Sequence, residues 1–345
     1  MQEYEEYKKQ LQEHILEYLP REFQGAAVSF QTVTKEWGEE EGIIIQTPWH
    51  NSAPIIYLQD WYQRYRETGD LEETIQGIAD MRVFLFEREN GLQRIIEEQK
   101  LTDYEQIKDQ IFPMVIHSEI QKEYLENNHL VYRDLMDLAV IYKVKVAEFG
   151  GDRGWMPVTE RLLETYQVTE EELYAQSMEN MHRESKIHTM VIANGNEKEM
   201  FFDPMFADVQ PEEWKDYLDK SLMMVRDMSL PGGAGVLCNQ EVLQKLAEAA
   251  GEDLIIIPSS VEEILVLRAD DGFSSLSLDT MIQSVNSTDV LPGQVLSDHA
   301  YYYSRQEQEL MTFSEYEERR MEQNPLQEYL RRSSARRFSP LDLER

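Results

Sequence analysis

The amino-acid sequence predicts an α+β protein built from two or three α/β units with antiparallel or mixed sheets. Amphipathic helical stretches alternate with short runs of alternating apolar residues, and turn residues separate them. A chain of 345 residues with 41 % hydrophobic side chains can also form more than one core. The predicted units are residues 1–100, 101–193 and 194–313, followed by a mobile charged tail at residues 314–345.

The first unit is predicted from helical spacing and from alternation with period two. Apolar side chains recur at steps of three and four until Pro20, which ends the first helix. Asp70 and Glu73 have the spacing of a capping box at the start of a later helix. The predicted elements are a helix at 2–19, a hairpin of strands at 28–33 and 42–47, a strand at 54–58, and helices around 61–65 and at 71–89.

The middle unit repeats this order of elements. Thr169 and Glu172 again have the spacing of a capping box, and a shift of 100 residues aligns Glu72 with Glu172. An ancient duplication and a chance resemblance between two amphipathic units both explain this pattern. The predicted elements are strands at 111–120 and 135–149, a glycine-rich turn at 150–154, and helices at about 159–166 and 170–183.

The last unit has the most varied pattern. Its predicted elements are an irregular connection at 194–213, a helix at about 211–228, a flexible glycine-rich linker at 229–235, a strand at 235–239, a helix at 240–251, strands at 253–260 and 262–269, a helix at 275–286, and strands at about 298–304 and 309–313. From residue 235 this is the β-α-β-β-α-β order of a ferredoxin-like unit. The order leaves the strand pairing open.

The charge of the chain limits its partners. With 33 Lys and Arg against 66 Asp and Glu, the formal net charge is −33, which repels phosphate backbones, so direct nucleic-acid binding is not expected. The acids either keep the protein soluble or imitate DNA to inhibit a DNA-binding protein. Four arginines gather in the tail, which is either a docking segment or a solvated terminus: Arg331, Arg332, Arg336 and Arg337.

The sequence also indicates a compartment. The acidic N-terminus has no apolar signal region, and no run of about 18 apolar residues occurs, so neither secretion nor a membrane partner is expected. Cys238 is the single cysteine and cannot form an internal disulfide, which fits a cytoplasmic location. Because its neighbours are apolar, Cys238 is predicted to be a buried, inert thiol.

Motifs for cofactors and metals are missing from the sequence. It contains no phosphate-binding or dinucleotide-binding glycine motif, and its seven histidines lack the spacing of paired ligands on one helix. We therefore predict no cofactor and no metal.

The remaining candidates for catalysis lie near the ends of two predicted strands of the last unit. They are Ser259, Ser260 and Glu262 after one strand, and Asp298 and His299 before another. If these segments are adjacent, a serine, a histidine and a carboxylate could perform base-activated nucleophilic attack. The alternative is that the polar groups form turn hydrogen bonds and that His299 is a half-buried sheet residue.

Five short phrases occur together in the sequence: Tyr18-Leu19-Pro20, Asp137-Leu138-Ala139-Val140, Val168-Thr169-Glu170-Glu171-Glu172-Leu173, Pro258-Ser259-Ser260 and Leu296-Ser297-Asp298-His299-Ala300-Tyr301. As a set they resemble an uncharacterised bacterial family of unknown function, found mainly in anaerobic Gram-positive gut bacteria. The resemblance covers about residues 1–313 and implies a bacterial, cytosolic setting without an assigned activity. Its relatives carry a histidine after Pro-Ser-Ser-Ile/Val, where this chain has Glu262, which weakens a catalytic histidine at that position.

Three functional hypotheses follow. The first is a non-enzymatic cytosolic binding or interaction protein with an unknown protein or small-molecule partner, because amphipathic units and tyrosine groups are present and catalytic motifs are missing. The second is a hydrolase-like enzyme that uses the serine, histidine and carboxylate group. The third is an acidic DNA-mimic inhibitor.

Overall fold

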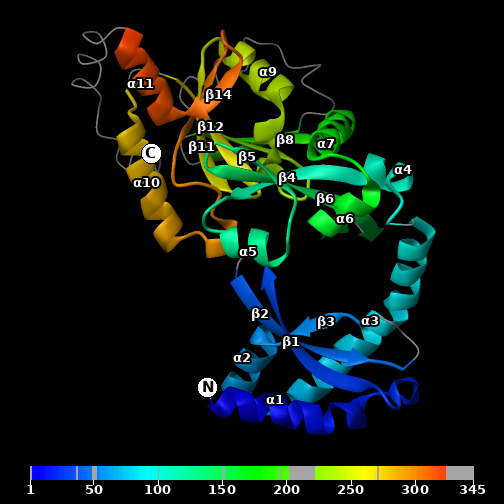
Figure 1. Cartoon of the computed structure of the whole chain (residues 1–345). Coiled ribbons are helices and arrows are strands. Elements are labelled where there is room, and N and C mark those ends of the chain that lie inside the picture. Colours follow the sequence, from blue (N-terminus) through cyan, green and yellow to red (C-terminus); the bar gives the residue numbers. More distant parts are fainter. Residues whose placement is uncertain are drawn as a thin grey trace. The chain divides into compact units, whose positions relative to one another are not determined.

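The computed structural model describes residues 2–35, 38–48, 53–99, 101–149, 152–193, 196–201, 222–269 and 272–323. The chain forms two compact units, residues 1–101 and 102–345, which are described separately. Both units combine helices with antiparallel sheets, which confirms the α+β class (Figure 1). The boundary predicted after residue 193 lies inside a hairpin of the second unit, between two paired strands.

The N-terminal unit packs helices against a three-stranded antiparallel sheet of order β1-β2-β3. Its elements are α1 (Gln2–His14), 3-10 helices η1 (Ile15–Tyr18) and η2 (Arg21–Phe23), β1 (Ala27–Lys35), β2 (Gly38–Gln46), β3 (Ile55–Tyr57), α2 (Gln59–Thr68) and α3 (Leu71–Gln99). Leu11 of α1, Ile43 of β2 and Ile78 of α3 are fully buried in one core cluster. The predicted cap of α3 is present, since Asp70 Oδ1 accepts the Glu73 N–H at 2.9 Å.

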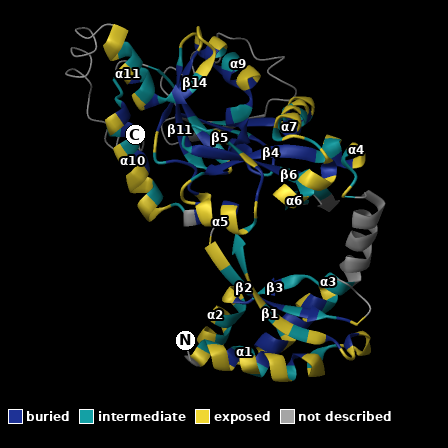
Figure 2. Cartoon of the chain, in the orientation of Figure 1, coloured by how far each residue is buried: buried dark blue, intermediate teal, exposed yellow. Residues whose placement is uncertain are grey.

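The second unit begins with a four-stranded antiparallel sheet in which the long strand β6 is central. Its elements are α4 (Tyr104–Ile107), η3 (Lys108–Gln110), β4 (Ile111–His117), α5 (Lys122–Asn127), β5 (Tyr132–Leu135), β6 (Leu138–Phe149), β7 (Asp152–Pro157), α6 (Glu160–Tyr166) and α7 (Glu170–Glu184). Strand β4 is buried along its whole length, as Figure 2 shows. The capping box of Thr169 and Glu172 is confirmed at the start of α7. Gly150 and Gly151 of the predicted turn lie outside the described residues.

A seven-stranded antiparallel sheet follows, in the order β14-β13-β11-β12-β10-β8-β9. Its elements are β8 (Ile187–Ala193), β9 (Asn196–Phe201), β10 (Leu222–Asp227), η4 (Gly233–Cys238), α9 (Gln240–Ala250), β11 (Leu254–Ser260), β12 (Glu263–Arg268), α10 (Ser275–Thr288), η5 (Pro292–Gln294), β13 (Tyr301–Ser304) and β14 (Glu309–Thr312). The ferredoxin-like prediction is wrong, because residues 235–238 of its predicted first strand belong to the 3-10 helix η4. Residues 202–221 of the predicted connection and helix lie outside the described residues.

Two elements of this sheet differ from the sequence prediction. Residues 222–227 form strand β10 rather than the end of a helix, because their apolar run pairs with β8 and β12 on both sides. Residues 235–239 were predicted as a strand, but 233–238 form the buried 3-10 helix η4. The preceding linker is packed rather than open: a Cβ on Gly233 would lie 2.1 Å from the Glu262 carbonyl oxygen. Only glycine allows this close approach.

The first ten residues of the predicted mobile charged tail are helical. Residues 314–323 belong to α11 (Phe313–Gln323), which packs on the sheet. Phe313 and Glu317 are buried, and the ring of Tyr316 stacks on Tyr302 with centroids 3.5 Å apart. Residues 324–345, with the four tail arginines, lie outside the described residues. Among the described helices, none combines the length and apolar content needed to cross a bilayer.

Candidate functional site

The predicted serines lie in the turn between β11 and β12, and each makes a local hydrogen bond. Ser259 Oγ donates to Glu263 Oε1 at 3.4 Å, and the Glu262 N–H donates to Ser260 Oγ at 3.1 Å. Within the part of the chain that the structure describes, neither hydroxyl bonds to His299. These contacts are turn hydrogen bonds, and a catalytic role for the two serines stays a prediction.

His299 is held by a carboxylate from α10. Its Nδ1 lies 3.0 Å from Asp279 Oδ2, while the Ala300 N–H donates to Asp279 Oδ1 at 2.9 Å. The hydrogen bond to Asp279 raises the pKa of His299, and the charges of Asp137 and Asp298 act in the same direction. Asp298 itself accepts a hydrogen bond from the Asn286 side chain at 2.9 Å. The structure thus brings His299 and Asp298 together near α10, with Asp279 as the orienting residue that the sequence prediction missed.

Two of the phrases that carry the family resemblance meet next to this pair. Asp137, in the turn between β5 and β6, accepts the Ser297 hydroxyl at 2.6 Å and the Tyr301 hydroxyl at 2.8 Å. The Asp137 carbonyl accepts both the N–H and the hydroxyl of Ser118, at 3.1 and 2.7 Å. Because Ser297 and Tyr301 are fully buried, this network joins the two sheets rather than presenting a nucleophile.

Cys238 has the environment of an unreactive thiol. It packs beside the core at the end of η4, and burial raises the pKa of its thiol to about 12. A thiol with that pKa is almost entirely protonated at neutral pH and is a weak nucleophile. Among the residues that the structure describes, no group of three or more His, Cys, Asp or Glu side chains is arranged to hold a metal ion.

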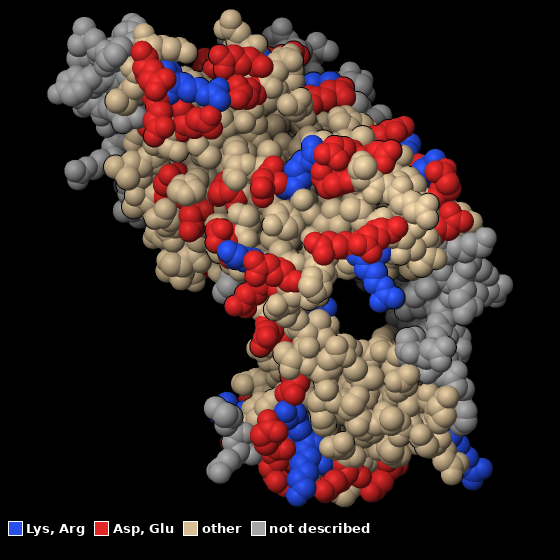
Figure 3. Space-filling view, in the orientation of Figure 1, with Lys and Arg blue, Asp and Glu red and all other residues tan. Residues whose placement is uncertain are grey.

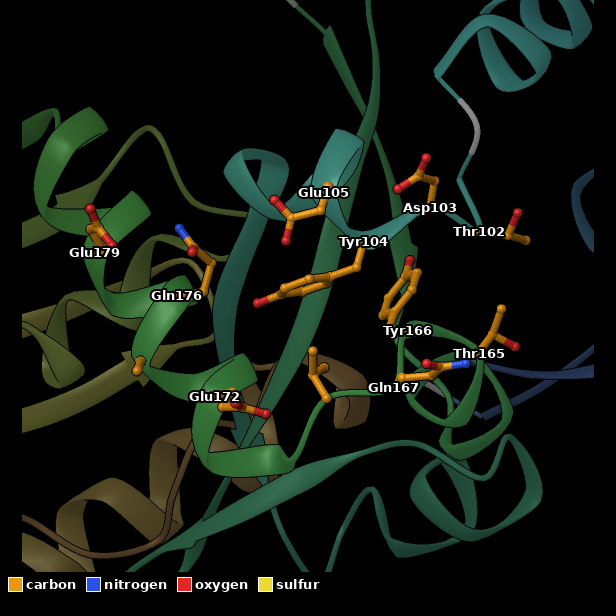
Figure 4. A pocket seen from close by; sticks show the side chains of 12 residues that line it. Thr102, Asp103, Tyr104, Glu105, Thr165, Tyr166, Gln167, Glu172, Gln176 and Glu179 are labelled. Carbon is orange, nitrogen blue, oxygen red and sulfur yellow. The ribbon is translucent and has the colours of Figure 1, made fainter.

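A cavity of the second unit lies between α4, α6 and α7 and has a volume of about 800 Å³ (Figure 4). The Tyr104 ring extends from α4 toward α7, and the Tyr166 ring at the end of α6 lies beside it, with centroids 5.6 Å apart. Tyr166 is buried and Tyr104 is half-buried. The two rings therefore form an apolar wall that remains partly accessible from the cavity.

Carboxylates surround these rings, and the described residues that line the cavity include no Lys or Arg. The four acids are Asp103, Glu105, Glu172 and Glu179. Glu105 pairs with Lys108 at 2.6 Å, whereas Asp103, Glu172 and Glu179 form no ion pair with another described residue. The pKa of Tyr104 is raised, first by burial and then by the charge of Glu172, so this phenol stays neutral. The cavity, which we call the Tyr104 pocket, therefore combines aromatic faces with uncompensated negative charge.

The sequence prediction gave a specific role to Glu172 of the Tyr104 pocket, as a helix cap. Its cap role is real, because Glu172 Oε2 accepts the Thr169 N–H at 2.8 Å. Tyr104 and Tyr166 are far apart in the sequence and meet only through the packing of α4 against the α6–α7 corner. No spacing rule along the chain could have joined them.

Acidic side chains are distributed over both units rather than confined to this pocket. On the face shown in Figure 3, Asp and Glu form separate groups, interrupted by Lys, Arg and uncharged surface. That face carries no double row of acids of the kind expected for a DNA mimic. The DNA-mimic hypothesis stays a prediction.

Comparison with known proteins gives one match. A model described as a family of unknown function (DUF5688) matches residues 4–305. No curated protein and no solved structure matches the chain.

Proposed function

The chain belongs to the DUF5688 family of unknown function, and we propose that it is a bacterial, cytosolic binding protein whose Tyr104 pocket holds an organic cation. The cation is an ammonium or guanidinium group, carried either by a small amine or by a side chain of a basic peptide. The observation that carries this proposal is the placement of two tyrosine rings beside three carboxylates without ion-pair partners.

Cations are attracted to the faces of aromatic rings, and each partly exposed contact contributes about 0.5–1 kcal/mol. Exposed ion pairs add roughly 0.2–1 kcal/mol each. Two rings and three carboxylates therefore support a dissociation constant on the order of 1 mM for a single cationic group. The net charge of −33 also raises the local concentration of cations around the protein.

The test is an NMR titration of the full chain carrying ¹³C-labelled tyrosine. The probe is N-acetyl-arginine amide, and its neutral isostere N-acetyl-citrulline amide is the control. We expect the Tyr104 and Tyr166 signals to shift with the arginine probe alone. Glu179→Gln should weaken binding about 3-fold, since one exposed ion pair is lost, while Glu171→Gln, on the same helix outside the pocket, should have no effect.

Agmatine and a tetra-arginine peptide distinguish the two sources of the cation. If the pocket binds small amines, the dissociation constants of agmatine and of the peptide, expressed per cationic group, should be equal. If it binds a peptide, the peptide should bind more tightly per cationic group. Equal shifts with arginine and citrulline probes would show that charge is not recognised and would refute the proposal.

The hydrolase-like hypothesis ranks second, on the observation that Asp279 orients the His299 ring. A base held in this way supports nucleophilic catalysis only when a nucleophile lies within about 3 Å. The test is an esterase assay of the full chain and its variants. If the chain has esterase activity, and if both His299→Ala and one of Ser259→Ala and Ser260→Ala abolish it, the hydrolase-like hypothesis is favoured over the binding hypothesis.

A further inference from the structure

The N-terminal unit contains a second cavity with similar chemistry. It has a volume of about 540 Å³ and lies between α1, β2 and α2. Its aromatic wall is formed by Tyr4 and Tyr62, whose rings meet edge to face with centroids 4.7 Å apart. Its acids are Glu39, Glu40 and Glu41 of β2 and Asp60 of α2, and among the described residues that line it there is no Lys or Arg. We call this cavity the Tyr4 pocket.

The wall of the Tyr4 pocket already holds an ammonium group of the chain itself. Lys8 Nζ lies 2.9 and 3.0 Å from the two carboxylate oxygens of Glu41 and 2.9 Å from Glu5. The same ammonium lies 5.1 Å from the centre of the Tyr4 ring. Tyr4 and Glu41 line the cavity, so two of its residues bind a primary ammonium in this structure. Lys8 thus shows which ligand chemistry this surface accepts.

Charge remains in the pocket after Lys8 is counted. Lys8 compensates Glu41, whereas Glu39 and Asp60 form no ion pair with any other residue that the structure describes. Asp60 also lies in the first turn of α2, and Glu39 is exposed on β2. A second cation entering beside Lys8 would therefore find carboxylates and the Tyr62 ring still accessible.

We propose that the Tyr4 pocket is a second organic-cation site, selective for primary ammonium groups such as a lysine side chain. The ammonium group of Lys8 competes with such a ligand for Glu41. The site is independent of the Tyr104 pocket, because each cavity is formed within one unit of the chain.

The experiment follows the signals of Tyr4 and Tyr62 in the ¹³C-tyrosine-labelled full chain, assigned with the Tyr4→Phe and Tyr62→Phe variants. The probe is N-acetyl-lysine amide, and the neutral control is the same molecule acetylated on its side chain. We expect shifts at both tyrosines with the lysine probe and none with the acetylated one. Asp60→Asn should weaken binding about 3-fold, and Glu13→Gln, an exposed acid of α1 outside the pocket, should leave it unchanged.

Substitutions of Lys8 test the proposed site most directly. Lys8→Met removes a like charge beside the pocket and frees Glu41, so the probe should bind about 3- to 10-fold tighter. Lys8→Arg should bind the probe as the unchanged protein does. Circular dichroism of both variants checks that the unit is folded. Weaker binding by folded Lys8→Met, or equal shifts with the lysine and acetylated probes, would overturn the proposal. The Tyr104 and Tyr166 signals, read in the same titration, report separately on the Tyr104 pocket.

Discussion

The contribution of α11 to the stability of the second unit can be tested by two truncations. The sequence predicts that deletion of residues 314–345 leaves stability nearly unchanged, whereas the structure places 314–323 in α11 against the sheet. We therefore expect deletion of 314–345 to destabilise the second unit. Deletion of 324–345 is the matched control, because it leaves α11 complete.

The magnitude follows from the contacts that the longer deletion removes. The stacked Tyr302–Tyr316 pair contributes about 0.5–1.5 kcal/mol beyond its buried area. Glu317 is 2 % exposed and accepts the Ser275 hydroxyl at 2.8 Å, and a hydrogen bond to a charged group contributes about 1.5–3 kcal/mol. The sum is about 2–4.5 kcal/mol, which corresponds to a fall in Tm of roughly 4–18 °C for a unit of this size.

Differential scanning calorimetry of the full chain and both truncated chains measures this effect. The transition of the second unit should move in the longer deletion and stay within about 2 °C in the shorter one. If the longer deletion melts within 2 °C of the full chain, α11 does not contribute the stability derived from these contacts. If the shorter deletion is equally destabilised, the stabilising contacts lie beyond Gln323, and the reasoning from α11 is wrong.

Two further predictions concern the packing at Gly233 and the His299–Asp279 pair. Gly233→Ala should lower the free energy of unfolding by about 1–3 kcal/mol in urea denaturation, because its Cβ would lie 2.1 Å from the Glu262 carbonyl oxygen. The control is Gly251→Ala, where the added Cβ meets no atom within 4 Å but φ is +75°. This control should lower the free energy of unfolding by only about 1 kcal/mol. Equal costs would show that the close approach at Gly233 costs no more than the positive φ at Gly251, and would contradict this reasoning. Because Asp279 raises the folded-state pKa of His299, the stabilisation by this pair is complete below the unfolded pKa of about 6.5 and is lost as pH rises through the higher folded pKa. The difference in Tm between the unchanged protein and Asp279→Asn should therefore shrink between pH 6 and pH 9, and a constant difference would contradict this assignment.

Local features were predicted well from the sequence because their causes are local. The caps at Asp70 and at Thr169 with Glu172 depend on hydrogen bonds between residues three apart, and both are present. The helix at 240–250 follows a periodicity of 3.6 and the strand at 263–268 a periodicity of 2, which one element imposes on its own residues.

The predictions from the sequence are wrong where contacts with neighbouring elements decide the conformation of a segment. The run Leu222–Val225 is apolar throughout, and such a run suits a buried helix or a buried strand until its hydrogen-bonding partners are known. Its partners β8 and β12 are distant in sequence. The glycines before η4 look like a flexible linker along the chain, but they are required because the β11–β12 turn presses against them.

The sequence by itself determined the α+β class, the acidic charge, the helix caps and the lack of familiar cofactor motifs, since each is a property of composition or of short spacing. Only the tertiary structure decided the strand order, the packing of α11, the orientation of His299 by Asp279, and the meeting of Tyr104 with Tyr166 and of Tyr4 with Tyr62. The physical reason is that a binding surface is formed by side chains from elements far apart along the chain. Their proximity is set by the burial of a shared core and leaves no periodic pattern in the sequence.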